Sequence, residues 1–140
     1  MSAYDPDNIF AKILSGDLPS QTIFEDDAVK VIMDVMPQAD GHALVIPKAP
    51  SRNLLDADAE GFSVLFATVQ KIAIAAKQAF QADGVTVQQF NEAAGGQSVF
   101  HLHVHVIPRH EGVPLRGHAG GMADQDVLVE HAARYRAVLG

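Results

Sequence analysis

The sequence predicts an α+β domain: a five-stranded, mainly antiparallel sheet with a long covering helix, a short N-terminal helix and a C-terminal helix. Two stretches carry this prediction. Residues 100–109 alternate strictly between polar and aliphatic side chains, which is typical of a half-buried strand. Residues 58–81 instead repeat apolar side chains at i, i+3, i+4 and i+7, the spacing of a helix that covers a sheet.

The chain begins with a short helix and a hairpin. Asp7 is expected to cap a helix that runs to about Ser15, where Gly16 suits the position after the last turn. Strands are then expected at 22–25 and 29–34. The acidic pair between them favours a tight turn, because short acidic side chains bond their own backbone.

A third strand and the long helix follow. The strand is expected over 42–46, and Pro47 should stop it. Asp56 or Asp58 should begin the long helix, whose apolar stripe predicts core packing.

The second half of the chain supplies the other two strands and the last helix. A strand over 85–90 leads into a loop at 91–98 and then the histidine strand. Pro108 should end that strand, since it has no N–H for the ladder. The chain then turns irregular up to about Met122, and Asp124 should cap the C-terminal helix.

The composition limits which classes of function are possible. The 140 residues suffice for one domain. The net charge of −7 disfavours nucleic-acid binding, and the lack of cysteine excludes disulfides and thiol catalysis. No membrane-spanning run or signal peptide is apparent, so we expect a cytoplasmic protein.

Three histidines at i, i+2 and i+4 are the main chemical signal: His101, His103 and His105. On a strand they share one face, and three readings are open: a solvated polar face, a metal site, or nucleophilic catalysis by one imidazole. His101 and His105 would start about 13 Å apart at roughly 3.3 Å per residue, too far for both to reach one ion. Two neighbours could still share a metal with help from elsewhere, but we expect neither a metal nor a cofactor.

Catalysis by an imidazole fits the residues nearby. A neutral imidazole is a good nucleophile near pH 7. Gly95 and Gly96 precede the triad, and backbone N–H groups in such a loop can bind an anion. His110, His118 and His131 have no comparable neighbours and are expected on the surface.

These motifs resemble the histidine triad (HIT) family of nucleotide hydrolases and transferases. The family signature His-φ-His-φ-His-φ-φ, where φ is apolar, matches residues 101–107. Further matching blocks lie in family order at 9–14, 34–39, 41–48 and 95–100. The resemblance implies a single domain with a core at about 8–109 and a C-terminal extension at 110–140.

The resemblance implies a role for each site residue. His103 would attack the α-phosphorus and form a nucleotidyl-histidine intermediate, with His101 and His105 binding phosphate oxygens and assisting the leaving group. His42 would support the triad, and Asp34 would bind the ribose hydroxyls. The phosphate-loop positions are Asn91, Gly96, Gln97 and Ser98, with Ser98 near the leaving group. The apolar nucleobase pocket would comprise Ile9, Phe10, Ile13, Leu18, Ile32 and Leu44.

The two ends of the triad resemble different branches. The block Gly95-Gly96-Gln97-Ser98 and the first helix resemble the phosphoramidase (Hint) branch, whereas Pro108-Arg109 resembles the dinucleoside polyphosphate hydrolases. A purine nucleoside phosphoramidate is therefore the expected substrate, with Ap3A or Ap4A hydrolysis, or nucleotide binding with little turnover, as alternatives. The resemblance also implies a homodimer.

Overall fold

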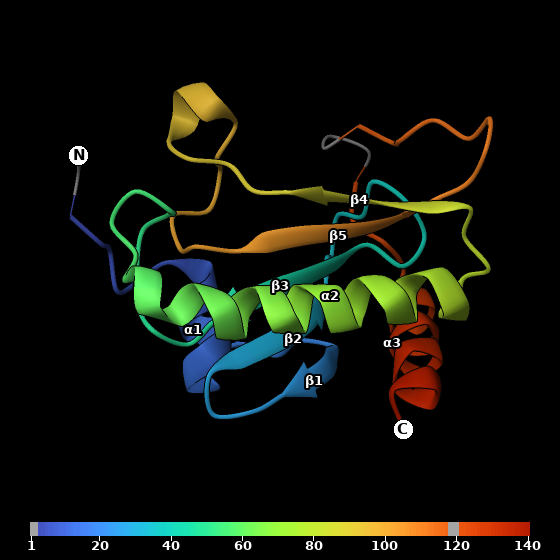
Figure 1. Cartoon of the computed structure of the whole chain (residues 1–140), viewed down its shortest axis with the longest axis horizontal. Coiled ribbons are helices and arrows are strands. Elements are labelled where there is room, and N and C mark those ends of the chain that lie inside the picture. Colours follow the sequence, from blue (N-terminus) through green and yellow to red (C-terminus); the bar gives the residue numbers. More distant parts are fainter. Residues whose placement is uncertain (1–2, 118–120) are drawn as a thin grey trace.

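Five antiparallel strands form one sheet in the order β1-β2-β3-β5-β4, as predicted (Figure 1). The computed structural model describes residues 3–117 and 121–140. Its strands are β1 (Thr22–Glu25), β2 (Val29–Met33), β3 (Ala43–Pro47), β4 (Gly84–Gln88) and β5 (Val104–Arg109). The helices are α1 (Ile9–Ser15), α2 (Phe62–Ala79) and α3 (Gln125–Leu139), with 3₁₀ turns at Ala59–Gly61 and Ala93–Gly95.

The helices and strands predicted from local sequence signals are present, with four corrections to the residues expected to begin or end them. Asn8, not Asp7, caps α1, because its side chain accepts the N–H of Ala11. Asp58 caps a 3₁₀ turn, and α2 begins only at Phe62. Pro47 lies inside β3.

Pro108 is the fourth correction, because it lies inside β5 rather than at its end. It pairs only with Val85 of β4, beyond the stretch of β5 that pairs with β3. No β3 acceptor there requires the N–H that proline lacks.

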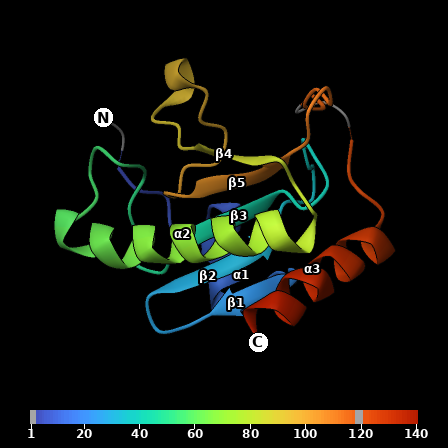
Figure 2. The ribbon, with the colours of Figure 1, turned by 45° about the vertical axis from the view of Figure 1, so that its right-hand side comes forward.

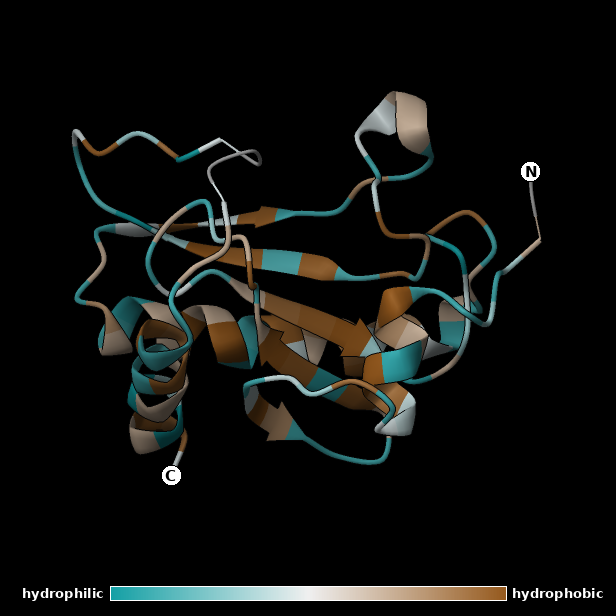
Figure 3. Ribbon diagram, turned by 180° about the vertical axis from the view of Figure 1, so that it is seen from behind, coloured by the Kyte–Doolittle hydropathy of each residue, from teal (hydrophilic) through white to brown (hydrophobic). Residues whose placement is uncertain are grey.

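The central strands of the sheet are buried on both faces, and β3 alternates between two apolar clusters. Ala43 and Val45 face the main core, whereas Leu44 and Ile46 face a second cluster beneath α1. Helices α2 and α3 pack in the main core, and α1 covers the opposite face (Figure 2). Seen from the α1 side, the central strands are mostly hydrophobic and the loops around them mostly hydrophilic (Figure 3).

Helix α2 supplies one face to the main core. Leu65, Val69 and Ile72 are buried there, whereas Phe66, predicted in the stripe, is 46% exposed. With the turn before it, α2 is long and apolar enough by composition to cross a membrane, the one such helix among the described residues. Its packing against the sheet is that of a core helix.

The 110–140 extension completes the main core. Leu128, Ala132 and Tyr135 of α3 are buried in it. His131, expected on the surface, is buried as well and stands edge-on to Phe80, because it shares the inner face of α3. His110 is half-buried and bonds the Phe80 carbonyl, and His118 lies outside the described residues.

Gly41 should be the least replaceable glycine of the fold. Its φ is +84°, and a Cβ there would lie 2.7 Å from the Phe80 ring. Gly41→Ala should therefore lower the free energy of unfolding by about 3 kcal/mol, from backbone strain and overpacking together. Urea unfolding measures this loss.

The matched control is Gly16→Ala. Gly16 has a φ of +90°, but a Cβ there would meet no atom within 4 Å, so only the backbone strain of about 1 kcal/mol should remain. Equal losses in the two variants would contradict the predicted clash.

Candidate active site

The three histidines do not all lie on the strand. Only His105 is in β5, and His101 and His103 belong to the irregular segment before it. The β3–β5 ladder stops at Val45 and Val104, because Pro47 of β3 has no N–H with which to extend it. The predicted alternation is otherwise confirmed: Leu102, Val104 and Val106 are buried in the main core.

His103 has its lone pair fixed at one nitrogen. Its Nδ1 lies 2.7 Å from the carbonyl oxygen of His101. Since a carbonyl only accepts, Nδ1 carries the proton and Nε2 is left as the nucleophilic atom. Burial lowers the pKa of His103, so the ring is neutral near pH 7.

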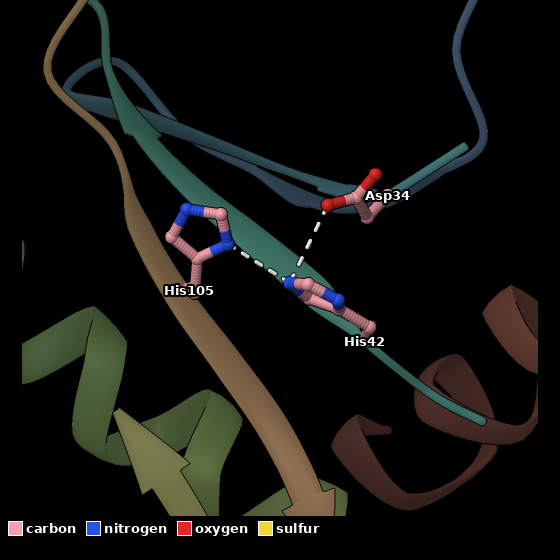
Figure 4. A group of neighbouring side chains, drawn as sticks. All are labelled: Asp34, His42 and His105. Carbon is pink, nitrogen blue, oxygen red and sulfur yellow. Dashed lines mark hydrogen bonds and ion pairs between the residues drawn. The ribbon is translucent and has the colours of Figure 1, made fainter. Parts of the chain in front are cut away.

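His42, His105 and Asp34 form a second hydrogen-bonded group (Figure 4). The backbone N–H of Gln38 donates to His42 Nδ1 at 3.0 Å, so the proton of His42 sits on Nε2. That nitrogen lies 2.9 Å from His105 Nδ1 and 3.4 Å from Asp34 Oδ2. His105 Nδ1 therefore accepts, and the proton of neutral His105 is on Nε2.

The same group is the described cluster whose geometry could hold a metal ion. The ligand atoms of Asp34, His42 and His105 lie within 4.8 Å of one another. A metal on His42 Nε2 would displace its proton while Nδ1 still accepts from Gln38, which would require an imidazolate. The hydrogen bonds thus favour a fixed hydrogen-bonded group over a metal site.

Four of the predicted pocket residues meet beside His103. Phe10, Ile13, Ile32 and Leu44 belong to the cluster beneath α1, and the Phe10 ring stands edge-on to His103 with centroids 4.8 Å apart. Leu44 is also the register partner of His105. Ile9 and Leu18 are 49% and 36% exposed, so they lie outside this buried cluster.

Gln97 is held by the protein on every side. Its Oε1 accepts from Glu92 N and Asn53 Nδ2, and its Nε2 donates to the carbonyls of Arg52 and Val99. Its amide thus joins the 52–53 segment to the loop, and its predicted phosphate contact stays a prediction.

The rest of the phosphate loop is also internally bonded. Asn91 bonds Leu54 N and the side chain of Gln89. The N–H groups of Gly95 and Gly96 donate to Glu92 and Ala93, so they close the 3₁₀ turn rather than point outward as an anion site. Ser98 is exposed beside this turn.

Sequence reasoning missed the ion pair that anchors this loop. Arg52 binds both oxygens of Glu92, at 2.8 and 3.0 Å, and stacks over Phe100. Asn53, fully buried, donates to the same carboxylate. The arginine contact lowers the pKa of Glu92. No spacing rule links positions 52 and 92, so only the fold reveals the pair.

Comparisons with known proteins agree with this geometry. Residues 15–112 match the HIT domain. A Hit-like protein involved in cell-cycle regulation from Bartonella henselae, solved with an unknown ligand, shares 54% identity at a TM-score of 0.93, over 97% of this chain and 98% of that one.

Two further relatives bear on the chemistry. A Zn-bound histidine triad family protein from Mycobacterium smegmatis shares 36% identity at a TM-score of 0.85, covering 95% of this chain and 93% of its own. Adenylylsulfatase HINT3 of Arabidopsis thaliana is 34% identical over 110 residues, 79% of this chain and 56% of the plant protein.

The bonding of Gln97 predicts a large stability effect. Gln97→Ala would leave several buried polar groups without partners and should lower the free energy of unfolding by about 3 kcal/mol. Gln70→Ala, on the exposed side of α2, should change it by no more than about 0.5 kcal/mol. A Gln97→Ala protein as stable as the Gln70→Ala control in urea would contradict the cross-linking role.

Proposed function

The chain belongs to the histidine triad (HIT) family of nucleotide hydrolases and transferases, and on that premise we propose a specific reaction for it. The enzyme acts at the α-phosphate of a purine nucleoside phosphoramidate or a related nucleotide. The reaction passes through a nucleotidyl-histidine intermediate on His103.

The tautomer of His103 is the observation that supports this proposal most directly. Its Nδ1–H is committed to the His101 carbonyl, so Nε2 offers a lone pair on a ring that burial keeps neutral. In the first step Nε2 bonds to the α-phosphorus as the bond to the leaving group breaks. Water then attacks the phosphorus, and the bond to Nε2 breaks to release the nucleotide.

His105 is proposed to donate a hydrogen bond to a phosphate oxygen in the first step. Its Nδ1 accepts from His42, so its proton is on Nε2, at the other end of the ring. The ring centroids of His103 and His105 are 5.0 Å apart, so both act on one bound phosphate. The leaving amine or phosphate takes a proton from solvent water, and the water that attacks in the second step returns one to the solvent. Exposed Ser98 is a proposed contact for the leaving group.

The apolar cluster and Asp34 support a nucleoside as the recognised part. Phe10 places the pocket against His103. Asp34 Oδ1 accepts the N–H of Met36, which fixes the carboxylate, and its second oxygen faces the same histidine group. Asp34 is proposed to accept hydrogen bonds from the ribose hydroxyls.

A homodimer joined through β4 is proposed as the working form, in the cytoplasm. Strand β4 lies at one edge of the sheet, and its Val87 is 45% exposed. Such an edge offers unpaired backbone groups to a second copy. Light scattering at micromolar concentration should give twice the chain mass, and a single-chain mass would overturn the dimer.

Covalent labelling tests the reaction. Rapid-quench mass spectrometry in the presence of EDTA should show a transient AMP adduct on the His103 peptide with adenosine phosphoramidate. His103→Ala should keep its fold and AMP binding but lose most turnover, because the remaining groups have no nucleophile to assist. The same assay is repeated with a panel of other substrates: diadenosine polyphosphates, which test the dinucleoside polyphosphate alternative, and adenylyl sulfate.

Three results would contradict the proposal. They are an adduct on another residue, near-normal turnover by His103→Ala, and activity that EDTA abolishes and zinc restores. AMP binding without turnover of any panel member would instead support a nucleotide-binding protein.

A further inference from the structure

The ring of His101 is clamped between two groups from distant parts of the chain. The Tyr4 hydroxyl lies 2.7 Å from its Nδ1, and the Pro47 carbonyl lies 2.8 Å from its Nε2. Because the carbonyl only accepts, Nε2 carries the proton and Nδ1 accepts from Tyr4. His101 is 1% exposed, so both bonds are shielded from water.

A single hydrogen bond links His101 to the proposed nucleophile, His103. The carbonyl oxygen of His101 is the acceptor that fixes Nδ1 of His103. The position of that oxygen depends on how the His101 residue is held. A shift of the His101 ring would therefore reorient the His103 imidazole.

Tyr4 reaches His101 from a segment with its own anchors. The Asp5 carbonyl accepts from the Asn8 side chain at 2.7 Å, and Asn8 caps α1. Helix α1 in turn carries Phe10, which packs on His103. Tyr4 also lies outside residues 15–112, the part of the chain that matches the HIT domain.

We propose that Tyr4 is a positioning residue, whose hydroxyl holds His101 so that its carbonyl aims His103 Nε2 at the phosphorus. The kinetic part of this role rests on the proposed function. Tyr4 touches no reacting atom in this scheme and acts through His101 alone.

A simpler role for Tyr4 would be to pack the N-terminal segment against the domain. Its ring stands edge-on to His101 with centroids 5.6 Å apart. Loss of that packing would loosen α1 and so weaken nucleotide binding through Phe10 and Ile13. Loss of the hydroxyl alone should leave binding intact and slow the chemical step.

Tyr4→Phe separates the two roles in the full-length protein, since it keeps the ring. The rate of adduct formation from adenosine phosphoramidate, measured by rapid quench, should fall about ten-fold. The Kd of AMP should stay within about two-fold. Asp5→Ala is the control: it removes the acceptor of the Asp7 N–H but keeps the hydroxyl, and should label at the wild-type rate.

Nitrogen NMR of the histidine rings, without nucleotide, reads the clamp directly. The wild type should show His101 protonated at Nε2, and Tyr4→Phe should shift the Nδ1 signal toward that of an unbonded lone pair. A wild-type proton on Nδ1, or identical ring spectra in the two proteins, would overturn the clamp whatever the kinetics.

The kinetic outcomes are also distinct. If the wild type forms the adduct and Tyr4→Phe forms it at the same rate, the positioning role alone is overturned. The same holds if Asp5→Ala slows adduct formation as much as Tyr4→Phe does. A wild type that forms no adduct overturns the proposed function, and with it the kinetic role of Tyr4.

Discussion

The hydrogen bond from the Gln38 N–H to His42 Nδ1 determines which nitrogen atoms of His42 and His105 carry protons. A neutral imidazole has one proton for two nitrogens, so a backbone donor at one nitrogen sends the proton to the other. The effect passes through His42 to His105, whose proton then lies on Nε2. The His101 carbonyl has the opposite effect on His103: as an acceptor it keeps the proton on Nδ1 and leaves the lone pair on Nε2. Backbone groups thereby leave His103 with a lone pair on Nε2 and His105 with an N–H on Nε2.

The loop that carries Gln38 and His42 is itself held by the C-terminal extension. The Tyr135 hydroxyl donates to the Gly41 carbonyl, and Arg116 N donates to the Gln38 carbonyl at 2.7 Å. Ala123 N adds a bond to Val35. Burial raises the pKa of Tyr135, which keeps its hydroxyl a donor. The extension therefore supports the site from the core side, whereas α1 and Tyr4 support it from the other.

The 52–53 segment and the loop at 91–98 both stabilise the fold and lie beside the proposed site. The Arg52–Glu92 pair and Gln97 bind the loop before the triad to the 52–53 segment. These contacts hold the loop in one conformation ahead of β5. The backbone N–H groups of Gly95, Gly96 and Gln97 donate to carbonyl groups within this loop. The apolar cluster of Phe10 and Leu44 then walls the histidines from the opposite side. A phosphate would meet fixed imidazoles whose orientation has been settled by folding, which is how preorganised polar groups lower a barrier.

The sequence by itself determined what depends on local periodicity. Alternation in 100–109 predicted that Leu102, Val104 and Val106 pack in the core, although the histidines opposite them are buried as well. The helical and turn signals predicted the sheet and α1, α2 and α3 to within a few residues. The resemblance of its motifs to the HIT family also predicted a pocket, and four of those residues meet beside His103. Only the tertiary structure decided the proton positions, the bonding of Gln97, the burial of His131 and the Tyr4 clamp on His101. The bonding of Gln97, the burial of His131 and the Tyr4 clamp depend on partners distant in sequence, and residue spacing carries no information about which distant groups a fold brings into contact. The proton positions depend on hydrogen bonds to nearby backbone groups, whose geometry residue spacing does not specify either.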